Sequence, residues 1–151
     1  MYIEKLQDHS IFYWLGNIFT ATPFVTVRHG FPANDLVAPT VAITKDTIEV
    51  FQLELGNRTK TQVRTWIIDV FGVNEGQRDD YAYLVFNTLD NPITVYNYDE
   101  GFPPAVSPSE IGCLDTTDKR LKMIEVFPEL VTDMYYRAEI RFTTIYQDHG
   151  G

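Results

Sequence analysis

The sequence has little of what most enzyme and metal sites are built from. Its 151 residues include one cysteine, Cys113, and three histidines. A single cysteine excludes an internal disulfide framework, and the scattered His9, His29 and His149 lack the spaced partners of a zinc site. The chain also has no Gly-x-Ser-x-Gly or His-Glu-x-x-His motif and no glycine-rich phosphate loop. We therefore expect no catalytic residue, no cofactor and no metal site.

Positive charge is scarce as well. The chain has 12 Lys and Arg against 21 Asp and Glu, which gives a formal net charge of −9. This balance argues against a protein that grips nucleic acid by its phosphates, because that needs clustered basic residues. No run approaches the roughly 18 apolar residues of a membrane span, and charges interrupt the first residues, so we expect no signal peptide. These features predict a soluble protein made in a cytoplasm.

The composition is that of a folded protein, with 44% hydrophobic and 14% aromatic residues. A chain of this length fits a single domain, residues 1–151, with one core. The segment 61–71 is rich in β-branched and aromatic residues and predicts a central strand, which the turn at 56–58 joins to residues 48–55. We therefore expect a long hairpin over residues 48–71.

A change of periodicity after this hairpin predicts a helix over residues 77–89. Asn74 and Gln77 have the spacing of a capping box. Asp79 and Asp80 suit the positive end of the helix dipole, and adjacent side chains on a helix point about 100° apart, which disfavours a shared metal ion. Val85 lies at the centre of the expected apolar stripe, whose other members are Tyr81, Leu84 and Thr88.

The remaining segments complete an α+β pattern. An amphipathic helix is expected over residues 10–20 with Ser10 as its cap, followed by strands near 24–29 and 39–44. Pro92 ends the second helix, and residues 93–98 alternate as a strand. The proline-containing segment 99–119 predicts an extended loop, and two strands follow within 121–146. The sum is a mostly antiparallel twisted sheet of about six strands with two helices packed on one face.

Two groups of side chains leave alternatives open. Arg137 and Arg141 project from one side of the last strand with Glu139 between them, so they predict either a cross-strand ion-pair ladder or a subunit contact. Tyrosine is enriched both in ligand pockets and at interfaces. A ligand-binding domain or an enzyme without a recognisable motif is therefore the alternative, with a pocket lined by Tyr81, Tyr83, Tyr96 and Tyr98.

The order of these elements resembles the tail terminator proteins of long-tailed bacteriophages. The resemblance lies in Ala38–Ile43, in Thr65–Phe71 with the helix Gln77–Leu89, and in the closing Tyr136–Tyr146. It covers most of the chain as a pattern and an order of elements, without one diagnostic motif. The long proline-bearing loop departs from the pattern, which leaves another neck component, such as a head completion or connector protein, as an alternative.

The resemblance implies a structural role without catalysis. Such proteins form hexameric rings that cap the tail tube, stop its polymerisation and join the tail to the head connector, while DNA passes through the lumen. The implied partners are other copies of the chain, the tail tube protein and the head-tail connector or head completion protein. The implied location is the virion, in its tail or neck, after assembly in the host cytoplasm.

A ring needs contacts between two different patches of each subunit. The expected surfaces are the loops 101–118 and 30–39 and the hairpin tip 56–59. The candidate interface residues are Asn34, Asp35, Arg58, Tyr98, Phe102, Arg137 and Arg141.

Overall fold

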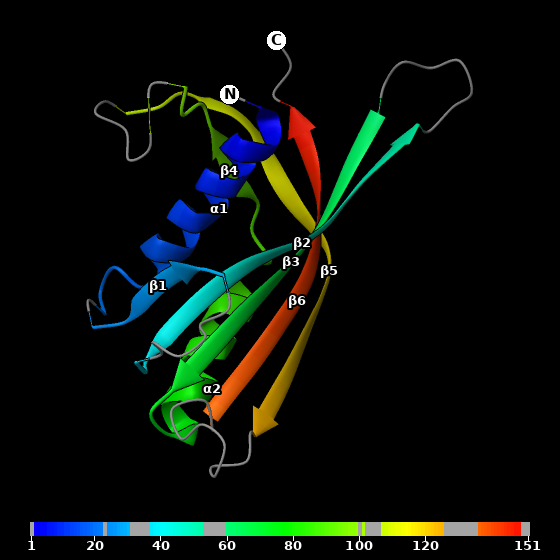
Figure 1. Cartoon of the computed structure of the whole chain (residues 1–151). Coiled ribbons are helices and arrows are strands. Elements are labelled where there is room, and N and C mark those ends of the chain that lie inside the picture. Colours follow the sequence, from blue (N-terminus) through cyan, green and yellow to red (C-terminus); the bar gives the residue numbers. More distant parts are fainter. Residues whose placement is uncertain are drawn as a thin grey trace.

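The fold is a curled six-stranded sheet with two helices, seen in a computed structural model (Figure 1). The structure describes residues 2–22, 24–30, 37–52, 60–99, 101, 107–125 and 136–148. Along these residues the elements are α1 (Ile3–Ile18), β1 (Thr26–His29), β2 (Thr40–Gln52), β3 (Lys60–Gly72), α2 (Glu75–Thr88), β4 (Ile93–Tyr96), β5 (Glu110–Glu125) and β6 (Tyr136–Asp148). The α+β class expected from the sequence is confirmed.

The strand order across the sheet is β1-β2-β3-β6-β5-β4. β1 and β2 run parallel, and every other neighbouring pair is antiparallel. The antiparallel pairing of β2 with β3 confirms the long hairpin. β3 and β6 are the two central strands, which explains why the sequence of β3 turns apolar on both sides toward its end.

Both helices pack on the same face of the sheet, as expected. Trp66, Ile68 and Val70 of β3 point toward them and are at most 1% exposed. The same core cluster contains residues of both helices, namely Leu6, Ile11, Leu15, Ala82 and Val85. Figure 1 shows α2 behind the sheet, while neither described helix covers the opposite face of β3, β6 and β5. We call this opposite face the helix-free face.

The first helix begins seven residues earlier than expected. α1 spans Ile3–Ile18, and Ser10 lies within it instead of capping it. Its hydroxyl donates to the Leu6 carbonyl oxygen at 2.7 Å and accepts from the Tyr96 amide at 3.0 Å. The expected start depended on Ser10 as a cap, and the helical turns before it contain the polar residues Gln7 and Asp8, which are buried.

The capping box of the second helix is present, and its apolar stripe is rotated from the expected one. Asn74 accepts from the Gln77 amide at 2.8 Å. The side chains turned inward are Arg78, Ala82 and Val85, whereas Leu84 is 44% exposed and Tyr83 is 50% exposed. The buried Arg78 hid this stripe, because a charged residue does not count toward an apolar pattern.

The expected loop over residues 99–119 is wrong in its second half. β5 begins at Glu110 and runs without a break in its chain to Glu125, pairing with β4 and β6. A register shift between Thr116 and Asp118 interrupts the alternation on which strand prediction depends. The two strands expected before and after Lys45 are one strand, β2, which contains a similar register shift between Lys45 and Ile48.

Candidate interaction surface

The described residues contain no group of three or more side chains placed to hold a metal ion. Cys113 is partly buried, and burial together with the neighbouring Asp115 raises the pKa of its thiol, which keeps it protonated. Asp79 is bound by the adjacent Arg78 at 2.9 Å. None of these groups has the environment of a nucleophile.

No helix in the described part of the chain is long and apolar enough to cross a membrane.

A cavity of about 360 Å³ lies between α1 and the sheet, where β1 ends. Burial lowers the pKa values of His9 and His29, so both imidazoles are neutral at pH 7. The ring of His29 stacks on Phe12 at a centroid distance of 4.0 Å. The cavity presents polar and basic groups in a small space; its lining is Lys5, Asp8, His9, Ile11, His29, Ile43, Lys45 and Trp66.

A buried ion pair beside this cavity fastens α1 to β3. The guanidinium of Arg64, whose residue is 1% exposed, lies 2.8 Å from the Asp8 carboxylate. It also donates to the Gln7 side chain at 3.0 Å and to the Glu4 carbonyl oxygen at 3.2 Å. Its carbon lies 4.0 Å from the centre of the Trp66 ring. This group positions the helix through both terminal nitrogens of Arg64, while the buried Nε has no hydrogen-bond partner among the described residues.

A ladder of charges crosses the helix-free face. Arg137 donates to Asp69 at 2.7 Å and to Glu139 at 3.2 Å. Arg141 lies 3.6 Å from Glu139 and 3.3 Å from Asp46. Burial raises the pKa of Asp69, and the bond from Arg137 opposes that rise. The ion-pair ladder expected around Arg137 and Arg141 is therefore present; their role in a subunit contact stays a prediction.

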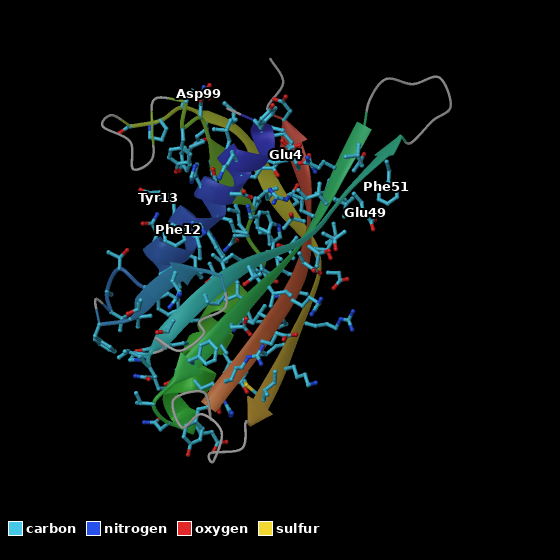
Figure 2. The ribbon with its side chains drawn as sticks, viewed as in Figure 1. Glu4, Phe12, Tyr13, Glu49, Phe51 and Asp99 are labelled. Atoms are coloured by element: carbon cyan, nitrogen blue, oxygen red, sulfur yellow. The ribbon has the colours of Figure 1, made fainter. Side chains whose placement is uncertain are left out.

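The outer ends of β2 and β3, residues 48–52 and 60–64, form a two-stranded ribbon whose far end extends beyond α1 (Figure 1). Within the ribbon, Gln62 accepts from Gln7 of α1 at 2.7 Å and donates to Glu4 at 3.1 Å. The exposed fractions of Ile48, Val50 and Phe51 on β2 are 44%, 55% and 49%. Figure 2 shows Glu49 and Phe51 on this ribbon, pointing away from the body of the molecule. Ile48 and Val50 lie on one face of the ribbon and Phe51 lies on the other, so both faces expose apolar side chains of the kind found at interaction sites.

The other expected interface residues divide into two groups. Asn34, Asp35, Arg58 and Phe102 lie outside the described residues, as does the hairpin tip 56–59. Tyr98 is 1% exposed, so its side chain belongs to the interior of the folded chain.

The four tyrosines expected to line one pocket occupy separate surroundings. Tyr81 packs against Phe19, Tyr83 is half exposed on α2, and Tyr96 lies 6.1 Å from Tyr98 between ring centres. A cavity of about 110 Å³ includes Tyr96 in its lining without the other three.

Sequence reasoning missed the exposed ribbon residues because β-branched and aromatic side chains read as core. The signal was Glu49, a charge between Ile48 and Val50, which marks a strand open to solvent on at least one side. The pairing of Arg64 with Asp8 left no such signal, because the two residues are far apart in the sequence.

Comparison with known proteins gives a likeness of fold alone. No protein-family model matches the chain, and no curated protein matches it. Among solved structures, the chain is similar to a chain of the virion of a native gene transfer agent particle. The two chains are 12% identical, the alignment covers 92% of each, and the TM-score is 0.44.

Proposed function

We propose that the chain is a structural protein of a phage-like virion and, within that class, a tail terminator. Its copies form a ring that caps the tail tube, ends tube polymerisation and joins the tail to the head connector. The proposal is supported by the resemblance in the order of elements, from the first helix to the closing pair of strands. It is also supported by an exposed surface suited to contact between subunits.

The projecting ribbon is the observation that carries this proposal. Val50 and Phe51 are about half exposed on an element that extends beyond the helices. Exposed apolar side chains of this kind lower the solubility of a protein, and their burial in a contact stabilises the complex. A ring closes when a patch of this kind meets a different patch on the next copy.

The charge of the chain suits the passage of DNA through such a ring. With a net charge of −9, a subunit repels phosphates at long range, so DNA slides through the lumen without being captured. The proposal therefore assigns the basic residues of the helix-free face to ion pairs within and between subunits.

Light scattering after size-exclusion chromatography, with negative-stain microscopy of the same fractions, tests the ring. We expect rings with a central opening, and a strict monomer over roughly 5–500 µM protein would refute the ring. Ile48→Asp should weaken assembly because it replaces an exposed apolar side chain of the ribbon with a charge. Val73→Asp is the matched control, since Val73 is 56% exposed outside the ribbon and should leave assembly unchanged.

The tail-specific role needs a second measurement. Tail tube protein from the same particle is allowed to polymerise with and without the chain. Tubes that become shorter and carry a ring at one end support a terminator. Tubes of unchanged length, combined with binding to the head connector, would instead assign the chain to another neck position.

A further inference from the structure

Among the described residues, both sides of the sheet present an open strand edge. β1 pairs with Thr40–Ile43 of β2, so the described remainder of β2, residues 44–52, has no neighbouring strand on that side. At the opposite side, β4 pairs with Glu110–Leu114 of β5, which leaves residues 115–125 open. Open edges of this length carry unpaired backbone donors and acceptors that can pair with another strand.

We propose that the open edge of β2 in one copy pairs with the open edge of β5 in the next copy, which makes one continuous sheet around the ring. This proposal rests on the ring of the proposed function and names its contact. Along the strand order β2-β3-β6-β5 the direction alternates, so β5 of a copy in the same orientation runs antiparallel to β2. The contact is heterologous, as a ring requires.

Opposite charges indicate a register for this pairing. We take the direction of β2, from Thr40 to Gln52, as upward. Within a copy, Glu49 of β2 then has the same height across the sheet as Asp115 of β5, and Arg120 of β5 lies four residue positions lower. Raising the next copy by about four residues along the strand direction, or about 13 Å, brings Arg120 opposite Glu49. The same shift places Lys122 beside Asp46 and Leu121 opposite Ile48. Two pairs of opposite charges and one apolar pair thus meet without moving any residue to the other face, whereas Lys119 falls opposite Val50 and Asp118 opposite Phe51.

Three of the four charged residues of this register are available for contact, whereas Asp46 already pairs with Arg141 at 3.3 Å within its own copy. Glu49, Arg120 and Lys122 are exposed, and none of them has an ion pair within the described part of the chain. By their cross-strand partners, all three lie on the helix-free face. Ile48 and Leu121 both lie on the helix side, where Leu121 is only partly buried.

The stagger has the size that a closed sheet needs. Four strands separate one contact from the next, and at about 4.8 Å per strand they span about 19 Å. A rise of about 13 Å over that width tilts the strands by roughly 35°, which lies at the edge of the range of about 35–45° found in β-barrels. With this stagger, β1 lies below the contact, because it pairs with the first residues of β2. β4 lies above the contact, because it pairs with the first residues of β5.

Cross-linking tests the register directly. Opposite residues in antiparallel strands have Cα atoms about 4.5–5.5 Å apart, within the reach of a disulfide. In a Cys113→Ser background, Glu49→Cys with Arg120→Cys should give covalent multimers on oxidation. Glu49→Cys with Lys122→Cys is the matched control, because these positions are two residues out of register and should cross-link far less.

A charge exchange tests the contact without oxidation. Glu49→Arg and Arg120→Glu should each raise the protein concentration needed for assembly by about tenfold or more, because each places like charges opposite one another. The double variant should restore assembly, and unchanged circular dichroism melting would confirm that all variants fold. Rings that persist without register-specific cross-linking would overturn this inference and leave the proposed function standing. Absence of rings in the unaltered protein would overturn the proposed function itself.

Discussion

Replacement of Asp8 by Asn should destabilise the fold by much more than its small size suggests. Asp8 is the carboxylate partner of Arg64, at 2.8 Å, and Arg64 is 1% exposed. Asparagine keeps the shape and one acceptor oxygen but removes the negative charge. The guanidinium then stays charged in a buried site with only the weaker influence of the Glu4 carboxylate to offset it, because Arg remains protonated at any pH at which proteins fold.

The expected loss lies at the low end of the range for a broken buried ion pair. Removal of one partner from such a pair costs about 3–5 kcal/mol. Arg64 keeps its bonds to Gln7 and to the Glu4 carbonyl oxygen and its contact with the Trp66 ring. We therefore expect the free energy of unfolding to fall by about 3 kcal/mol.

Urea unfolding, followed by circular dichroism at a fixed protein concentration, measures this loss. Asp46→Asn is the matched control, because it makes the same chemical change in an exposed pair. Asp46 lies 3.3 Å from Arg141, with side chains 40% and 44% exposed. The control should lose between 0 and about 1 kcal/mol. A loss in Asp8→Asn no larger than that of the control would refute the assignment of Asp8 as the charge that stabilises Arg64 in the core.

Two further predictions concern pH and packing. Because the pKa values of His9 and His29 are lowered in the folded state, the unfolded chain binds more protons below its own histidine pKa of about 6.5. Stability should be complete above that pH and fall as the pH drops through the lowered values; equal urea midpoints at pH 7.5 and 5.5 would contradict this. Gly112→Ala places a Cβ 2.5 Å from the Gln147 carbonyl oxygen and should cost about 1–3 kcal/mol in thermal unfolding. Gly16→Ala, with nothing within 4 Å, should instead stabilise by about 0.5–1 kcal/mol.

The sequence pattern predicted those parts of the fold in which apolar side chains are buried and polar side chains are exposed. β6 buries Ala138, Ile140 and Phe142 in strict alternation, and the cap at Asn74 depends on a spacing of three residues. The errors arise where polar groups are buried. Asp8 lies on the inner face of α1, and its burial depends on Arg64, which only the folded chain brings near it.

The surface residues of the last strand were predictable because their polarity matches their exposure, whereas those of the ribbon were not. Arg137 and Arg141 were found because alternation places them on one face of one strand. The exposure of Val50 and Phe51 depends on where β1 ends and on how far the ribbon extends beyond the helices, which are properties of the assembled sheet. A hydrophobic strand residue gives no sign in its own sequence of whether the chain covers it.

The two register shifts connect the fold to the proposed subunit contact. One lies in β2 between Lys45 and Ile48 and the other in β5 between Thr116 and Asp118, so each open edge strand carries one. An extra residue exchanges the two faces of everything beyond it, because side chains alternate with a period of two. Without its shift, β2 would turn Glu49 toward the helices, and without the other, β5 would do the same to Arg120. Each irregularity therefore places a charge on the helix-free face, and with only one of the two shifts Glu49 and Arg120 would lie on opposite faces.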